Sequence, residues 1–235
     1  MKRVPRLVRL LLVLAVLAPA AACGSEYSEL PPIDRTLQES SSIEEIIEEL
    51  KKGNRRFANG ESTPYESRED ARTLAKGQFP LAAFVDCIDS RLAVDVVFDC
   101  GLGTAFSANV AGNVVSPDVL GSLEYACKVA GSKVVVVLGH TRCGAVKGAC
   151  DGVELGNHTH LLAKIQPAID AVPDDGTPRT SKNHAFTTKV ATENVRLMVD
   201  QVRRDSPVLR ELEAEGKILI TGAVYDVDTR RVTWL

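Results

Sequence analysis

A histidine and two cysteines stand directly after segments that are predicted to be buried strands. His140 and Cys143 follow the apolar run 134–138, and Cys87 follows the largely apolar run 80–86. Continuous apolar runs of this length are typical of parallel strands buried on both faces. The carboxyl ends of such strands meet at one edge of the sheet, so we expect the three side chains to lie together. Thiolate and imidazole ligands suit zinc, and three protein ligands leave a fourth position for water, as in a catalytic site.

A carboxylate and a guanidinium lie within the same motif, Cys-Ile-Asp-Ser-Arg, as Asp89 and Arg91. A carboxylate two residues from a zinc ligand could itself become the fourth ligand and close the site. A guanidinium can hold that carboxylate in a forked, charge-assisted pair instead. Asp89 would then accept a hydrogen bond from the metal-bound water and orient it. The alternative is a surface ion pair of little energetic weight, but a position inside the ligand motif favours the functional interpretation.

These motifs resemble those of the β-class carbonic anhydrases. The resemblance rests on Cys-x-Asp-Ser-Arg at 87–91, Ala-Gly-Asn at 111–113 and His-x-x-Cys-Gly at 140–144, and it extends over about residues 43–235. It implies an α/β fold, with a parallel-core β-sheet flanked by α-helices in a single domain that has an N-terminal helical extension. It also implies one Zn²⁺ per subunit, held by Cys87, His140 and Cys143. The implied reaction is the reversible hydration of carbon dioxide to bicarbonate and a proton through a zinc-bound hydroxide.

The resemblance further assigns four residues to the substrate pocket. Gln78 matches a glutamine whose amide binds bicarbonate in the family. Phe106 matches a residue in the apolar wall of the carbon dioxide pocket, and Tyr125 matches a tyrosine at the rim of that pocket. Gly144 would offer its backbone N–H to a substrate oxygen at a helix N-terminus. From the residues alone, Gln78 could equally be an exposed loop residue, Phe106 a core residue and Tyr125 a structural one.

Asn109 is a departure from the family pattern. Many bacterial relatives carry arginine there, and in one subgroup that arginine and an aromatic residue three positions before the first cysteine ligand build an inhibitory bicarbonate site. This chain has Asn109 and Phe84 at these positions. An anion site without its cation is not expected to form, so we predict that bicarbonate does not inhibit the enzyme in this way.

The two thiolates also predict a pH dependence. Zinc held by three neutral histidines lowers the pKa of its bound water to about 7. Thiolates neutralise more of the metal's charge, so the pKa should fall less and activity should rise on the alkaline side. The sequence singles out no proton shuttle.

The sequence also admits functions other than hydration. The same scaffold could hydrolyse carbonyl sulfide or carbon disulfide, or the chain could be a non-catalytic zinc-binding homologue. Intact ligands and an intact Asp89–Arg91 pair argue against a protein without activity. A thiol redox protein is disfavoured because the sequence has no Cys-x-x-Cys. Cys100, Cys127 and Cys150 are odd in number, so we expect free thiols rather than a disulfide framework.

The first 22 residues read as a signal peptide. Four basic residues within 1–9 precede an uncharged apolar run over 10–22, which is too short to span a bilayer. Residues 20–24 resemble a bacterial lipobox with Cys23 as the lipidated residue, although Ala20 departs from the usual pattern; simple cleavage is the alternative. Residues 23–42 would be a flexible tether and 43–235 the domain. The expected location is extracytoplasmic, lipid-anchored to the membrane or else periplasmic or secreted.

Composition and charge exclude one class of partner. The chain is 45% hydrophobic and 25% charged, which is ordinary for a globular domain. Without its first 22 residues it carries 24 basic and 31 acidic residues, with no basic patch or aromatic platform, so nucleic acid is not an expected partner.

Two further helices are predicted in the mature chain. Ser42 and Glu45 form a capping-box pattern before an amphipathic helix. In the family such helices wrap around a partner subunit, implying a homodimer or a dimer of dimers; the alternative is packing on its own domain. A single helix is predicted over 161–172.

Overall fold

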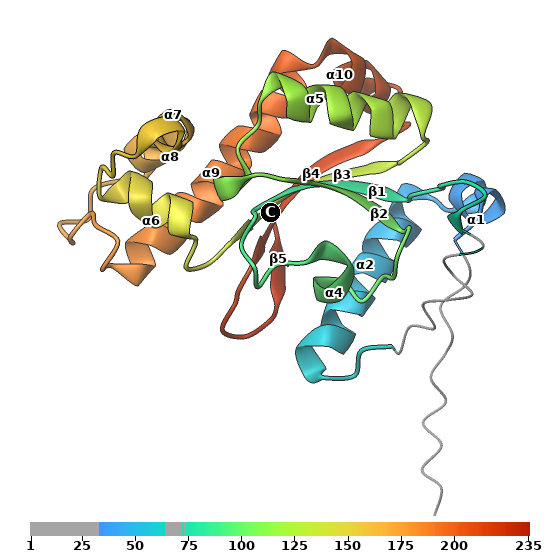
Figure 1. Cartoon of the computed structure of the whole chain (residues 1–235), viewed down its shortest axis with the longest axis horizontal. Helices are drawn as coiled ribbons and strands as arrows, with labels where there is room; N and C mark the ends of the chain where they lie inside the picture. The colour runs from blue at the N-terminus through green and yellow to red at the C-terminus, as the bar shows by residue number, and fades with distance from the viewer. Residues whose placement is uncertain (1–32, 64–71, 73) are drawn as a thin grey trace, which may run out of the picture.

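The computed structural model describes residues 33–63, 72 and 74–235. Its centre is a sheet with the strand order β2-β1-β3-β4-β5. The strands are β1 (Ala82–Asp86), β2 (Ala105–Asn109), β3 (Val134–His140), β4 (Leu219–Tyr225) and β5 (Val232–Trp234). The first four are parallel, and β5 returns antiparallel to β4 (Figure 1). The predicted parallel-core sheet is therefore confirmed.

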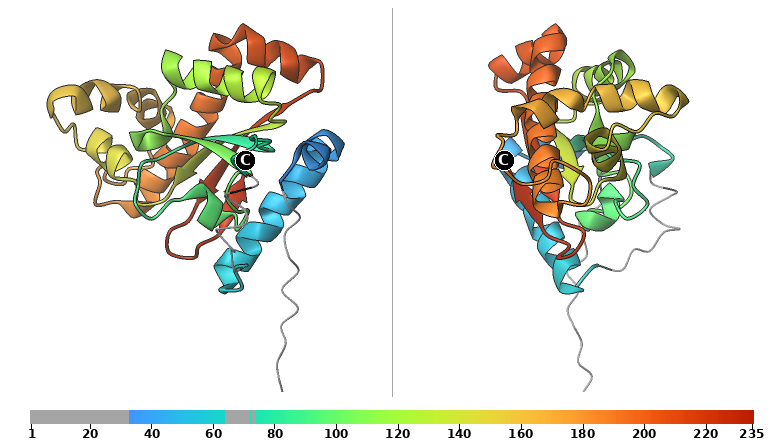
Figure 2. Two further views of the ribbon diagram at one scale, coloured as in Figure 1. Left: turned by 45° about the vertical axis from the view of Figure 1, so that its right-hand side comes forward. Right: turned by 90° about the vertical axis from the view of Figure 1, so that its left-hand side faces the viewer.

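Helices cover both faces of this sheet (Figures 1 and 2). The side chains of β1 alternate between the two cores: Ala83 and Val85 join one cluster, and Ala82 and Phe84 the other. The first cluster is closed by α5 (Pro117–Glu124), α6 (Gly144–Cys150), α7 (Gly156–Ala163), α8 (Gln166–Ala171), α9 (His184–Asp205) and α10 (Pro207–Ala214). The second is closed by α2 (Ile43–Asn59) and α4 (Val94–Val97). Within the described ranges, no helix is both long and apolar enough to cross a membrane.

The N-terminal helices pack on their own domain. The capping box of α2 is present: Ser42 Oγ accepts from Glu45 N at 3.1 Å, and the Glu45 carboxylate accepts from Ser42 N at 2.8 Å. The preceding helix α1 (Arg35–Ser40) is held by Gln38, whose amide donates to the carbonyls of Pro80 and Ala130, both at 2.8 Å. The expected tether over 23–42 is therefore too long, since its last residues belong to the fold. Residues 23–32 and the expected signal peptide lie outside the described residues.

Helix α2 meets α4 and β5 through two adjacent small or polar residues. A Cβ on Gly53 would lie 1.7 Å from Phe98 O, so α2 packs directly against the backbone of Phe98 with no side chain between them. Asn54 donates to Val97 O and accepts from Val232 N at 2.9 Å. These contacts join α4, α2 and β5 and fix the helix against its own sheet.

Gly53→Ala is expected to lower the free energy of unfolding by about 1–3 kcal/mol or more, because the added methyl group overlaps Phe98 O and the helix must move. Gly121→Ala in α5 is the matched control: no described atom lies within 4 Å of its Cβ position, and alanine favours a helix by up to about 1 kcal/mol. Urea unfolding of both variants measures the difference. Equal stabilities would contradict the close contact of α2.

The prediction of one helix over 161–172 is wrong. Helix α7 ends at Ala163, and α8 begins at Gln166. Pro167 explains the break, because it has no N–H to donate to the carbonyl of residue 163 and its ring would collide with that carbonyl. Ile165, between the helices, is fully buried in the core.

Candidate metal centre

The three predicted metal ligands lie together at the carboxyl edge of the sheet. Cys87 follows β1, His140 ends β3, and Cys143 precedes α6. Asp86 pairs with Leu138 in the parallel register, so the two strands end side by side. The candidate ligand atoms all lie within 4.8 Å of one another, the two sulfur atoms are 3.9 Å apart, and all three residues are buried. The structure thus brings together the group that the sequence predicts.

The imidazole of His140 has one nitrogen engaged and one available. Nδ1 lies 2.9 Å from Thr141 O, so the hydrogen bond assigns the proton to Nδ1. Nε2 is buried and finds no hydrogen-bond partner among the described residues. A buried lone pair without a partner is unfavourable. One nitrogen and two sulfur atoms converging on that lone pair form a donor set that fits zinc.

The two thiols influence each other's ionisation. The pKa of Cys87 is lowered, because the Cys143 thiol donates to its sulfur and because His140 and the Gly112 N–H, at 3.3 Å, also stabilise the thiolate. The pKa of Cys143 is raised in turn, because the neighbouring Cys87 thiolate and burial oppose a second negative charge. A divalent cation removes this conflict and allows both sulfur atoms to ionise.

Asp89 and Arg91 form the expected forked pair at the border of this centre. Arg91 donates from Nε to Oδ1 and from Nη2 to Oδ2, both at 2.8 Å, and its backbone N donates to Oδ1 at 3.0 Å. Arg91 thereby lowers the pKa of Asp89 to about 2. Asp89 Oδ2 is 3.9 Å from His140 Nε2. An ionised carboxylate therefore stands next to the ligand atoms, with both oxygens held by arginine.

Gly144 is the first residue of α6 and follows Cys143 directly. No described atom lies within 4 Å of the position that its Cβ would take. The glycine therefore leaves open space beside a ligand at the start of a helix, where backbone N–H groups point outward.

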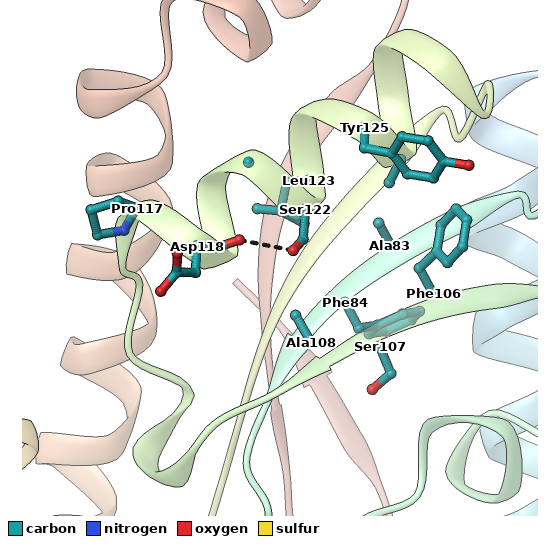
Figure 3. A pocket seen from close by; sticks show the side chains of 12 residues that line it. Ala83, Phe84, Phe106, Ser107, Ala108, Pro117, Asp118, Ser122, Leu123 and Tyr125 are labelled. Atoms are coloured by element: carbon teal, nitrogen blue, oxygen red, sulfur yellow. Dashed lines mark hydrogen bonds between the residues drawn. The ribbon is translucent and has the colours of Figure 1, made fainter.

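Gln78, Phe106 and Tyr125 gather elsewhere. Gln78 Nε2 donates to Tyr125 Oη at 3.4 Å, and the rings of Phe106 and Tyr125 are 6.2 Å apart. Phe106 and Tyr125 line a groove of about 670 Å³ between α5 and the strands β1 and β2 (Figure 3). Phe106 pairs with Ala83, four residues before Cys87, which is about 13 Å along the strand. Within one chain, these three residues do not reach the metal centre.

Asp86 is a site neighbour that the sequence reasoning missed. It is fully buried directly before Cys87, and it accepts from Asn109 Nδ2 at 2.7 Å and from Ser107 Oγ at 2.5 Å. Burial raises the pKa of Asp86 to about 6. Asn109 is therefore a neutral partner for a buried carboxylate. An aspartate at the end of a buried strand, next to a ligand, was the signal that could have revealed it.

The remaining described cysteines, Cys100, Cys127 and Cys150, are free thiols, as predicted. Burial raises the pKa of each, to about 12 for Cys100 and Cys127 and about 11 for Cys150. None of them belongs to the ligand group.

The fold and donor set together define a class: a zinc-binding α/β enzyme with its metal at the carboxyl ends of parallel strands. Residues 82–232 match the family model described as carbonic anhydrase. Carbonic anhydrase 2 of Mycobacterium tuberculosis is 35% identical over 77% of this chain and 87% of its own length. The carbonic anhydrase of Mycolicibacterium smegmatis is 33% identical over 78% and 88%.

Solved structures agree with this match. A crystal structure of tetrameric β-carbonic anhydrases from Sordaria macrospora superposes with a TM-score of 0.63 and 25% identity, covering 78% of this chain and 93% of that one. A Coccomyxa β-carbonic anhydrase in complex with acetazolamide gives the same score and identity, over 78% and 83%. The chain belongs to the carbonic anhydrase family, in its β class.

Proposed function

We propose that this chain hydrates carbon dioxide reversibly to bicarbonate and a proton, with zinc bound by Cys87, His140 and Cys143. The observation that carries the proposal is the buried convergence of two sulfur atoms with the unpartnered Nε2 of His140. Zinc held there would supply a Lewis acid that activates water for attack on carbon. Three protein ligands would leave one position for that water.

In this proposal Asp89 and Arg91 control the open position. The pKa of Asp89, at about 2, keeps the carboxylate ionised at neutral pH, so it accepts a hydrogen bond and orients the attacking water. Arg91 occupies both carboxylate oxygens and keeps Asp89 from becoming the fourth ligand, the closed state that the motif otherwise permits. Gly144 offers open space and a backbone donor for the product oxygen.

The substrate pocket is proposed to need a second copy of the chain. Gln78, Phe106 and Tyr125 lie together but far along the strands from their own metal centre. Tyr125 is 47% exposed, so the group is accessible to another subunit. A homodimer, or a dimer of dimers, would place this group of one subunit over the centre of the other. The related Sordaria enzymes are described as tetrameric.

The activity is tested by stopped-flow hydration of carbon dioxide with the zinc-loaded chain, the chelated chain and the chain reloaded with zinc. Activity should follow zinc content, and kcat/KM should rise towards alkaline pH, with no acid limb from Asp89 above about pH 4 because its pKa is about 2. The same preparations are offered carbonyl sulfide and carbon disulfide. Zinc-loaded protein that does not hydrate carbon dioxide, or a flat pH profile, would overturn the proposal.

We also propose export and anchoring, on sequence alone. Cleavage before Cys23 and its lipidation would place the domain outside the cytoplasm at the bacterial membrane, and cleavage without lipidation would leave it periplasmic or secreted. Mass spectrometry of the first peptide of the mature chain distinguishes the two.

A further inference from the structure

Two strand glycines let helix α9 pack closely on the sheet beside the metal centre. Gly139 in β3 and Gly222 in β4 face Val195 of this helix. A Cβ on Gly139 would lie 2.5 Å from Val195 Cγ2, and one on Gly222 would lie 2.6 Å from Val195 Cγ1. Only glycine permits this contact. The helix backbone therefore lies close to the strand end that carries His140.

Asn194, the residue before Val195, makes a hydrogen bond that depends on this close packing. Asn194 is fully buried, and its Nδ2 donates to Gly112 O at 2.9 Å. The reverse orientation of the amide would set two oxygen atoms against each other, so the hydrogen bond fixes the orientation. Asn194 Oδ1 has no partner among the described residues. Among the described residues, the side-chain amide of Asn194 therefore makes its hydrogen bond to Gly112 alone.

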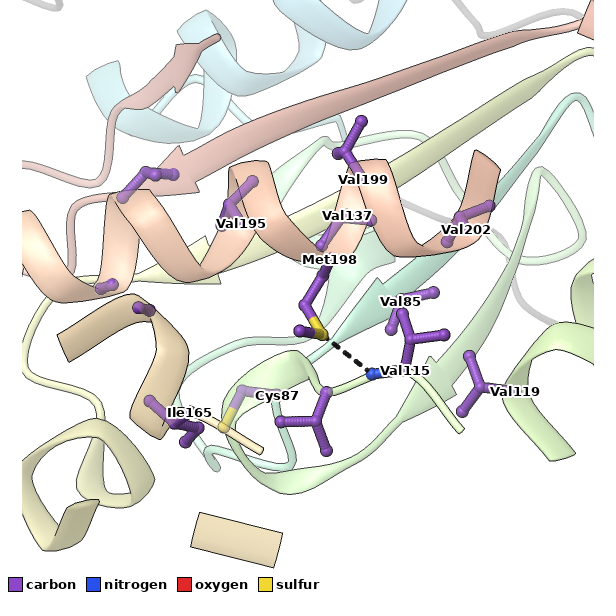
Figure 4. Close-up of a cluster of buried hydrophobic side chains, with 14 of the residues drawn as sticks. Val85, Cys87, Val115, Val119, Val137, Ile165, Val195, Met198, Val199 and Val202 are labelled. Carbon is purple, nitrogen blue, oxygen red and sulfur yellow. Dashed lines mark hydrogen bonds between the residues drawn. The ribbon is translucent and has the colours of Figure 1, made fainter. Parts of the chain in front are cut away.

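Gly112, which accepts the hydrogen bond from Asn194, also contacts a predicted metal ligand. Its N–H donates to Cys87 Sγ at 3.3 Å. Its φ of +68° lies in the left-handed region, and a Cβ there would come within 2.8 Å of Ile165 Cδ1. Figure 4 shows Cys87 beside Ile165 and beneath α9. The backbone at Gly112 thus has an uncommon conformation that aims its N–H at the sulfur.

We infer that Asn194 is a positioning residue for the Cys87 ligand: by holding Gly112 O, it keeps the Gly112 N–H directed at the sulfur. This inference rests on the proposed zinc site. A hydrogen bond to a thiolate fixes the direction of the sulfur, which favours zinc binding. It also draws charge from the sulfur, so less charge passes to the metal and its bound water is more acidic. Asn194 thereby contributes both to zinc affinity and to the acidity of water at the open position, without touching either.

A purely structural role would have different consequences. Met198, one turn along α9, makes a comparable tie: Val115 N donates to its Sδ at 3.2 Å (Figure 4). That contact joins α9 to Val115, three residues after Gly112, but Val115 makes no hydrogen bond to a predicted metal ligand. Met198→Leu is therefore the matched control for Asn194→Leu, since both replace a buried polar contact by an apolar side chain of similar size.

The test measures the zinc dissociation constant by competition with chromophoric chelators, with thermal melting of the metal-free protein as the check on folding. Asn194→Leu is expected to raise the dissociation constant about 10- to 100-fold and to move the midpoint of the kcat/KM profile to higher pH. Met198→Leu should change the constant less than about threefold. If Asn194→Leu does not fold, Asn194→Ala takes its place, since it also removes the donor.

A double-mutant cycle isolates the path through Cys87. The effect of Asn194→Leu on zinc binding should disappear in a Cys87→Ala background and persist in a Cys143→Ala background. An equal effect in both backgrounds, or equal constants for Asn194→Leu and Met198→Leu, would overturn the inference. Failure of the wild-type chain to bind zinc would instead overturn the proposed function, so the two failures are distinguishable.

Discussion

An equimolar mixture of the His140→Ala and Gln78→Ala variants is expected to regain activity that neither variant has alone. His140→Ala removes a zinc ligand and should abolish hydration. Gln78→Ala removes one donor to the developing charge and should lower kcat about 10²–10³-fold. If Gln78 acts on the partner's metal, a mixed dimer pairs the intact centre of one chain with the intact Gln78 of the other. One of its two sites is then complete.

The expected recovery can be stated as a rate. Random exchange of subunits makes half of the dimers mixed, so the mixture should reach about a quarter of the wild-type rate per dimer. Subunits are exchanged by mild denaturation and refolding, and stopped-flow hydration is measured before and after. The control mixes His140→Ala with Cys143→Ala, which damage the same centre and cannot complement each other. No gain in the first mixture would place Gln78 within its own chain's site, or outside any site.

Arg91→Ala is expected to lower kcat/KM about 10²–10⁴-fold, although Arg91 is not a metal ligand. The substitution removes both side-chain hydrogen bonds to Asp89. The freed carboxylate, with Oδ2 3.9 Å from His140 Nε2, can then take the fourth coordination position and exclude water. The loss should appear at saturating substrate as well, because water and not carbon dioxide is displaced.

The control and the rescue make this prediction specific. Arg142 lies within the His140–Cys143 motif but pairs with exposed Asp228 at 2.7 Å, so Arg142→Ala should change kcat/KM less than about threefold. The double variant Asp89→Ala/Arg91→Ala should be more active than Arg91→Ala, since the closing carboxylate is gone. A crystal structure of zinc-loaded Arg91→Ala reports whether an Asp89 oxygen stands in the fourth position in place of water. A fourth position in that structure that is free of Asp89 would refute closure by Asp89.

Much of the fold was predictable because its signals are local. The apolar runs before Cys87 and His140 predict buried parallel strands, and the Ser42–Glu45 spacing predicts a capped helix. The structure contains these strands and this helix. Strand ends in a parallel sheet share an edge, so the ligand group followed from strand order alone. The break between α7 and α8 was also local, at Pro167, but the apolar periodicity obscured it.

What the sequence by itself determined is therefore the donor set, the Asp89–Arg91 pair and the sheet that presents them, since the motifs and apolar runs are local and parallel strands share their carboxyl edge. Only the tertiary structure decided which distant side chains meet. The register of β1 and β2 separates Phe106 from its own metal centre, and two glycines let α9 bring Asn194 to Gly112, 82 residues away in the chain. Such contacts depend on how closely packed elements approach, and no single segment of the sequence encodes that distance.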